Sequence, residues 1–183
     1  MWKSYICNNN RTIMGQNKEI YLAGGCFWGT EHYFKQVHGV LETEVGFANG
    51  RFENPSYKQV KVGDTGFAET VRIVYDPQVV TLELLLDLYF KSIDPLSLNR
   101  QGEDSGTQYR TGIYYVDESD LPVIDKVYDA VQASLGQPLA VEKLPLSNFY
   151  TAEEYHQDYL DKNPDGYCHL PVALFEFARK ANR

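Results

Sequence analysis

The sequence predicts an α+β domain in which helices pack on a mixed sheet. Segments with strand and helix periodicity follow one another in the order β-α-β-β-α-β, which is the split βαβ pattern of ferredoxin-like domains. A further helix and strand and a long irregular C-terminal segment are added to this core. The 183 residues are enough for one domain with a substantial core. We expect a loosely ordered arm at 1–17 and a single domain at 18–183.

The first half of the chain supplies three strands and two helices. The run from Glu69 to Tyr75 alternates and is rich in β-branched residues, as a half-buried strand is. Gly39 ends the first helix, and Ser56 is placed to cap the second. In chain order we expect a strand at 19–23, a helix at 26–37, a strand at 42–48, a short helix at 57–62 and a strand at 69–75.

The second half begins with a helix whose start is well marked. Thr81 is a preferred N-cap residue, and Glu83 places a negative charge in the first helical turn. Thr151 and Glu154 have the spacing of a capping box. A long loop is expected at 94–110, and long loops inside a compact domain are usually functional. In chain order we expect a helix at 82–93, that loop at 94–110, a strand at 111–116, a helix at 119–135, a strand at 139–146 and a helix at 155–160.

The composition is that of a globular chain and excludes some partners. Hydrophobic residues make up 43% of the chain and charged residues 23%. The net charge of −8 argues against nucleic acid, because phosphate binding needs a basic surface. No apolar run approaches the length of a membrane span, and residues 1–18 contain no signal-peptide core. We therefore expect a cytoplasmic protein.

The three cysteines, Cys7, Cys26 and Cys168, are too few and too far apart for a disulfide scaffold. The absence of a Cys-x-x-Cys pair removes the signature of a zinc ribbon or a thioredoxin-type redox pair. We expect neither a metal ion nor an organic cofactor. Cys7 lies in the polar arm and is expected to be a spare thiol.

Cys26 is the most informative residue of the chain. It stands in the run Gly24-Gly25-Cys26-Phe27-Trp28-Gly29, between a predicted strand and a predicted helix. A thiol at a helix N-terminus has a lowered pKa, because the helix dipole favours the thiolate. A free cysteine can also be a plain core residue, but flanking glycines indicate close backbone approach. Phe27 and Trp28 can form an apolar wall beside the sulfur, so the run predicts a reactive cysteine facing a small, partly apolar group.

Other candidates are weaker when each is taken alone. Glu69 begins a predicted strand, where it is either a solvated charge or a carboxyl among aromatic residues whose pKa is raised enough to donate a proton. Asp104 and Tyr109 lie in the long loop, which either lines a polar cleft or is simply solvated. Tyr57 follows a turn and is either a functional residue or simply packs against its neighbours. Cys168 lies in a turn-rich segment, poorly placed for a core and well placed to approach a second thiol.

The four histidines are expected to be structural or solvated. His32 follows Cys26 by six residues and therefore points away from it on a helix. His38 is expected to end that helix, and His156 to make a structural hydrogen bond. His169, in the C-terminal segment, is expected to be solvated.

Taken together, these segments resemble the peptide methionine sulfoxide reductase A family. The matching runs occur in the family's order over roughly 19–169 and are Gly25-Cys26-Phe27-Trp28-Gly29, Asn54-Pro55-Ser56-Tyr57, Gly63-Asp64-Thr65-Gly66 with Ala68-Glu69, Gly106-Thr107-Gln108-Tyr109-Arg110, and Asn163-Pro164 with Gly166-Tyr167-Cys168. Phe67 and Ser105 depart from relatives that carry His there, and no cysteine follows Cys168 that could serve as a third thiol.

The resemblance implies an oxidoreductase that reduces the S epimer of methionine sulfoxide, free or in proteins, with thioredoxin as reductant. By this resemblance Cys26 is the nucleophile and Cys168 the resolving cysteine. Glu69, Tyr57 and Tyr109 bind and protonate the sulfoxide oxygen. The implied substrate-binding residues are Phe27, Trp28 and Asp104.

Two alternatives remain open from the residues alone. One is a cysteine hydrolase or acyltransferase that uses Cys26 with His156, which needs the imidazole within hydrogen-bond reach of the thiol. The other is a binding domain whose cysteine is incidental. The default oligomeric state is a monomer.

Overall fold

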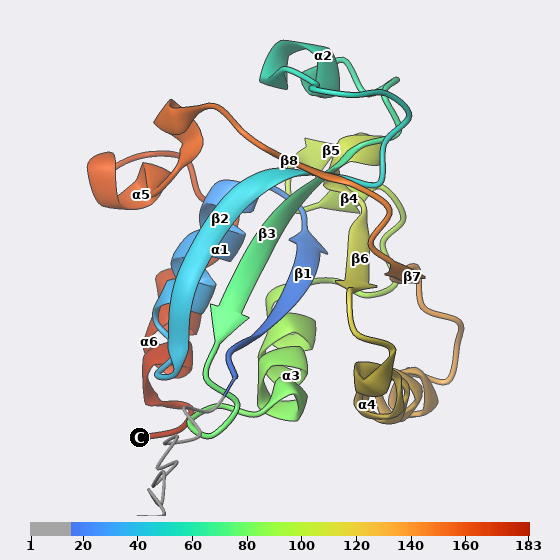
Figure 1. Cartoon of the computed structure of the whole chain (residues 1–183), viewed down its shortest axis with the longest axis vertical. Coiled ribbons are helices and arrows are strands. Elements are labelled where there is room, and N and C mark those ends of the chain that lie inside the picture. Colours follow the sequence, from blue (N-terminus) through green and yellow to red (C-terminus); the bar gives the residue numbers. More distant parts are fainter. Residues whose placement is uncertain (1–15) are drawn as a thin grey trace, which may run out of the picture.

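A computed structural model describes residues 16–183 as a six-stranded mixed sheet with helices packed on it (Figure 1). The strand order is β7-β6-β1-β3-β2-β8, and β6-β7 is the parallel pair. β3 lies between β1 and β2 and is antiparallel to both, which is the split βαβ order that the sequence predicts. The strands are β1 Lys18–Gly24, β2 Val40–Ala48, β3 Ala68–Tyr75, β6 Thr111–Tyr115, β7 Glu142–Pro145 and β8 Phe149–Thr151.

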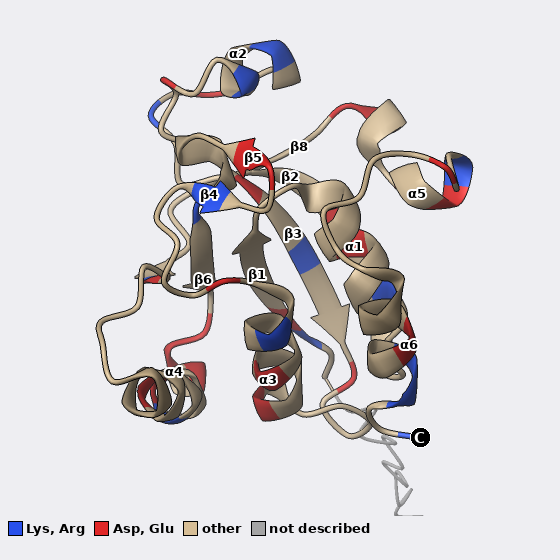
Figure 2. Cartoon of the chain, turned by 180° about the vertical axis from the view of Figure 1, so that it is seen from behind, with Lys and Arg blue, Asp and Glu red and all other residues tan. Residues whose placement is uncertain are grey.

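Three helices cover one face of the sheet. α1, α3 and α6 lie in front of the strands in Figure 2 and behind them in Figure 1, while α4 packs beside α3. The helices on this side of the sheet carry both acidic and basic residues, and the basic residues form no continuous stripe (Figure 2). The helices are α1 Phe27–Lys35, α2 Tyr57–Lys61, α3 Leu82–Ser92, α4 Leu121–Leu135, α5 Tyr159–Lys162 and α6 Val172–Lys180, with 3-10 turns η1 Thr107–Tyr109, η2 Glu118–Asp120 and η3 Glu154–His156.

The core lies between this helical layer and the sheet, and alternation along the strands selects it. Ile20 and Leu22 of β1 and Val71 and Ile73 of β3 are completely buried in it. The opposite face is covered differently, because residues 146–148 run across it from β7 to β8 (Figure 1). Small side chains allow this segment to approach the sheet, and the cluster there contains Tyr21, Ala23, Ala48, Ala68 and Tyr114 with Leu146 and Phe149.

The helix signals of the sequence are confirmed at two N-termini. Ser56 and Gln59 form a capping box at α2, and the Thr81 hydroxyl accepts a hydrogen bond of 3.1 Å from the Leu84 N–H at α3. Gly39 has a φ of 98°, which takes the chain from α1 into β2.

Several predicted boundaries are wrong. Thr151 belongs to β8, and Glu154 begins η3, so they form no capping box. The predicted long loop contains a hairpin, β4 Arg100–Gln101 with β5 Asp104–Ser105, followed by η1. The segment expected to be irregular contains α6, whose Phe175 and Ala178 are buried one turn apart. None of the helices within 16–183 is long and apolar enough to cross a membrane.

Candidate active site

Cys26 lies at the N-terminus of α1, where the sequence places it. Only 7% of this residue is exposed. The backbone N–H groups of Trp28 and Gly29 favour the thiolate of Cys26, but burial raises the pKa of this thiol well above its ordinary value. The expectation of a lowered pKa is therefore wrong, since the desolvation of the Cys26 thiol outweighs the effect of the helix terminus.

Gly25 allows the long loop to close over the cysteine. Its φ is 85°, and a Cβ at this position would stand 2.7 Å from the Cβ of Gln101. Gln101 is itself buried, and its side-chain amide exchanges hydrogen bonds of 2.8 and 2.9 Å with the backbone of Asp94. The sequence predicts close approach at these glycines, but nothing in it indicates Gln101, whose approach requires glycine at position 25.

Glu69, on β3, is the buried acid of the site. Its exposed fraction is 2%, and its Oε2 accepts a hydrogen bond of 3.1 Å from the N–H of Phe27, the residue after Cys26. Burial raises the pKa of Glu69 to about 8, and the charge of Asp104 adds to the increase. The carboxyl group is therefore mostly protonated at neutral pH and can donate a proton.

Two phenols complete the polar side of the site. Burial, followed by the charges of Glu69 and Cys26, raises the pKa of Tyr57 to about 12. Burial also raises the pKa of Tyr109, and after burial the largest effects come from the charges of Glu69 and Tyr57. Both hydroxyls therefore stay protonated at neutral pH, and the charges of Glu69 and Cys26 act on the pKa of each.

Phe27 and Trp28, the predicted apolar wall, each pack against further aromatic side chains. Phe27 is buried against Phe47, with ring centroids 5.8 Å apart. The Trp28 indole is half-buried and held at two points. Its Nε1–H donates to Nδ1 of His156 at 3.0 Å, and its ring stacks on Tyr159 at 3.7 Å.

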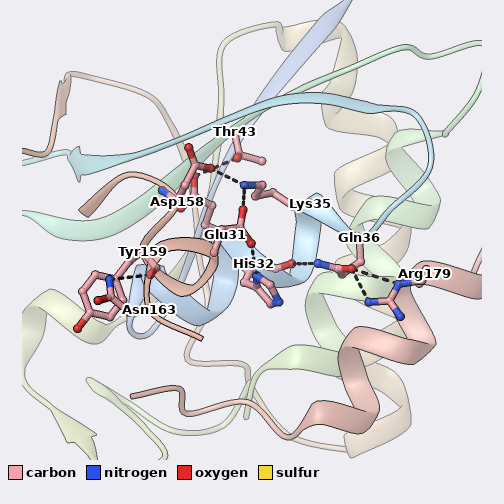
Figure 3. A network of polar contacts seen from close by, with 10 residues as sticks. Glu31, His32, Lys35, Gln36, Thr43, Asp158, Tyr159, Asn163 and Arg179 are labelled. Atoms are coloured by element: carbon pink, nitrogen blue, oxygen red, sulfur yellow. Dashed lines mark hydrogen bonds and ion pairs between the residues drawn. The ribbon is translucent and has the colours of Figure 1, made fainter. Parts of the chain in front are cut away.

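A polar network between α1 and the segment before Tyr159 is shown in Figure 3, and the Tyr159 ring stacks on Trp28. The buried Glu31 of α1 accepts hydrogen bonds from the Thr43 hydroxyl and from the N–H of Asp158, each at 3.0 Å. Lys35 of the same helix pairs with the Asp158 carboxylate. Burial raises the pKa of Glu31 to about 7. The network fixes the backbone just before Tyr159 against α1.

Cys168 lies against the first turn of α1. A Cβ added to Gly29 would stand 3.0 Å from its Sγ, so only glycine leaves room for this thiol. Cys26 and Cys168 are both free thiols. The preceding residue, Tyr167, donates its hydroxyl proton to Oδ2 of Asp104 at 2.8 Å. The predicted substrate-binding acid and the predicted resolving segment are thus joined. Cys7 lies outside the described residues.

The histidines divide into confirmed and corrected expectations. His156 is fully buried and structural as expected, since Nδ1 accepts from Trp28 and Nε2 faces Glu153 at 3.5 Å. Neither ring nitrogen is bonded to Cys26, which removes the geometry that the hydrolase alternative requires. His38 does not end the first helix, because α1 stops at Lys35. His169 is not solvated, because its Nε2 lies 3.1 Å from the carbonyl oxygen of Gly24.

A protonated carboxyl beside a buried thiol, with a second thiol at the same helical turn, defines a cysteine-dependent redox enzyme. No group of three or more His, Cys, Asp or Glu residues that could hold a metal ion occurs within 16–183. A sequence profile of the family described as peptide methionine sulfoxide reductase matches residues 18–182. The chain belongs to this family, and it is an oxidoreductase.

Known proteins similar to this chain agree with the assignment. "Peptide methionine sulfoxide reductase MsrA" of Clostridium acetobutylicum is 57% identical over 159 residues, which are 87% of this chain and 98% of the relative. The solved structure of reduced Mxr1 from Saccharomyces cerevisiae is similar with a TM-score of 0.79 and 45% identity, covering 84% of this chain and 89% of that one. The structure of Mxr1 in complex with Trx2 is similar with a TM-score of 0.56 and 28% identity, covering 81% and 91%.

Proposed function

We propose that this enzyme reduces the S epimer of methionine sulfoxide, free or within proteins, to methionine. The observation that carries the proposal is the pairing of a buried Cys26 thiol with a Glu69 carboxyl whose pKa is raised to about 8. A sulfoxide sulfur is a poor electrophile until its oxygen is protonated. A reaction of this kind therefore needs a nucleophile and a neutral acid in one dry pocket.

In the first step, the Cys26 sulfur attacks the sulfoxide sulfur while Glu69 protonates the sulfoxide oxygen. The thiol loses its proton, which restores the Glu69 carboxyl, and the oxygen passes to Cys26. The products are methionine and a Cys26 sulfenic acid. Tyr57 and Tyr109 assist as hydrogen-bond donors to the same oxygen, and their raised pKa values keep them protonated.

The pocket discriminates between epimers by geometry. The two epimers exchange the positions of the oxygen and the lone pair, so only one directs oxygen to Glu69 while sulfur faces Cys26. Phe27 and Trp28 receive the methyl group, and Asp104 receives the backbone of the substrate. The fixed orientation of Trp28 between His156 and Tyr159 supports this assignment.

In the second step, Cys168 attacks the sulfenic acid and forms a disulfide with Cys26, releasing water. The position of the Cys168 sulfur at Gly29, one helical turn from Cys26, supports this role. Thioredoxin then reduces the disulfide. The similarity to Mxr1 in its complex with Trx2 supports that reductant. We place the reaction in the single domain 18–183 of a cytoplasmic monomer.

Single turnover without reductant tests the proposal. The enzyme should release one equivalent of methionine from the S epimer, none from the R epimer, and lose two thiols. Cys26→Ser should release none, whereas Cys168→Ser should release one equivalent and fail to cycle with thioredoxin. Methionine release by Cys26→Ser would overturn the nucleophile, and sustained thioredoxin-driven cycling by Cys168→Ser would overturn the resolving cysteine.

A further inference from the structure

His169 is a half-buried side chain next to the resolving cysteine, and the reaction above leaves it without a role. It follows Cys168 directly and lies over the glycine-rich run before α1. A Cβ at Gly29 would stand 2.9 Å from its Nδ1 and 3.0 Å from the Cys168 sulfur. The imidazole nitrogen and the thiol therefore occupy the same small space above the first turn of α1.

The hydrogen bonds of the imidazole fix which nitrogen carries the proton. Nε2 lies 3.1 Å from the carbonyl oxygen of Gly24. A carbonyl can only accept, so Nε2 donates and carries the hydrogen in the neutral ring. Nδ1 is then unprotonated, and it is buried without a hydrogen-bond partner. An orphaned buried acceptor costs about 1–3 kcal/mol, which indicates that its partner arrives during the reaction.

We propose that Nδ1 of His169 is the base that takes the thiol proton of Cys168 when Cys168 attacks the sulfenic acid of Cys26. This inference rests on the proposed function, since it requires a sulfenic acid on Cys26. The hydrogen bond from His169 to the Gly24 carbonyl has a second effect. It connects the residue next to Cys168 to the glycine-rich run that precedes Cys26.

The step balances without a further reactant. Cys168 loses its proton to Nδ1, and its sulfur forms the S–S bond as the S–O bond on Cys26 breaks. The leaving oxygen departs with its hydrogen and takes the proton from Nδ1, which gives water. His169 returns to its starting tautomer, and the two sulfurs end as a disulfide.

The surroundings keep the ring neutral at neutral pH. Burial lowers the pKa of His169, and the negative charge of Asp104 opposes this only in part. Burial also raises the pKa of the adjacent Cys168 thiol and of the Cys26 thiol. A thiol held protonated by burial reacts slowly as a nucleophile unless a base removes its proton.

Two substitutions distinguish a role of His169 as a base from a purely structural role, in which it only donates a hydrogen bond to the Gly24 carbonyl. His169→Gln keeps an N–H that can reach the Gly24 carbonyl but offers no basic nitrogen, while His169→Ala removes both. After one equivalent of the S sulfoxide, methionine release reports the first step and loss of the second thiol reports the disulfide. The exposed His38→Gln is the control and should change neither rate.

We expect both His169 variants to release methionine at the wild-type rate and to form the disulfide about 10²-fold more slowly, within the range of general base catalysis. In the wild type, the disulfide rate should fall as the pH decreases through the pKa of His169. In the variants it should instead rise about tenfold per pH unit until Cys168 ionises. If His169→Gln forms the disulfide at the wild-type rate, His169 is not the base, whether or not His169→Ala is slow. Absence of methionine release from the wild type would overturn the proposed function itself.

Discussion

Replacing Glu69 by Gln should make the enzyme more stable and far less active. The structure buries this carboxyl and raises its pKa from an ordinary value of 4.5 to about 8. At pH 7 it is protonated in the folded state and ionised in the unfolded state. Folding therefore takes up a proton, which becomes harder to supply as the pH rises.

The size of the effect follows from the two pKa values. One pKa unit corresponds to about 1.36 kcal/mol, and pH 7 lies about 2.5 units above the unfolded value of 4.5. The ionisable carboxyl thus destabilises the fold by about 3 kcal/mol at pH 7, relative to a neutral side chain of the same shape. The stabilisation by the acid form is complete below about pH 4.5 and is lost as the pH rises through about 8.

Urea unfolding of the reduced proteins at several pH values measures this directly. The free energy of unfolding of Glu69→Gln minus that of the wild type should increase by about 2–3 kcal/mol between pH 5 and pH 7. Any constant cost of burying the new amide cancels in this comparison. First-turnover methionine release should fall by about 10²–10⁴-fold, since an amide donates a hydrogen bond but no proton.

The exposed Glu118→Gln is the matched control and should change stability by less than about 0.5 kcal/mol at every pH. The reasoning is refuted if the difference between Glu69→Gln and the wild type does not depend on pH. That result would mean that Glu69 is already ionised in the folded protein.

Three further variants test the supports of the site. His156→Ala should lower the free energy of unfolding by about 1–3 kcal/mol, because the half-buried indole N–H of Trp28 loses its acceptor; an unchanged urea midpoint would contradict this. Gly29→Ala places a methyl group about 3 Å from the Cys168 sulfur, so it should slow disulfide formation and spare the first methionine, as thiol counting can show. Phe175→Ala should lower the free energy of unfolding in urea by about 3–5 kcal/mol, because Phe175 is buried. An unchanged free energy of unfolding would mean that the C-terminal segment is solvated.

The split βαβ core could be predicted from the sequence because its signals are local. The alternation along β3 and the caps at Ser56 and Thr81 depend on neighbouring residues alone. β8 could not be predicted, since a three-residue strand exists only by pairing with β2. The helix α6 was missed although its apolar residues are spaced for one buried face.

At the site, too, local features could be predicted from the sequence, and features that depend on tertiary contacts could not. The glycines around Cys26 indicate close approach, but nothing in the local sequence names Gln101 as the group that approaches. The direction of the Cys26 pKa was predicted wrongly, because the helix terminus is a local signal and burial is a tertiary one. His169 was expected in water for the same reason, since its acceptor on Gly24 is 145 residues away in the chain.

The burial of Cys26 also bears on how such an enzyme survives its working conditions. Peroxide attacks thiolates far more readily than thiols and reaches exposed sulfurs first. A sulfur that stays protonated and enclosed until a sulfoxide enters resists stepwise oxidation to the irreversible sulfinic and sulfonic acids. The low reactivity of this enclosed thiol thus protects the oxidoreductase from irreversible oxidation at Cys26.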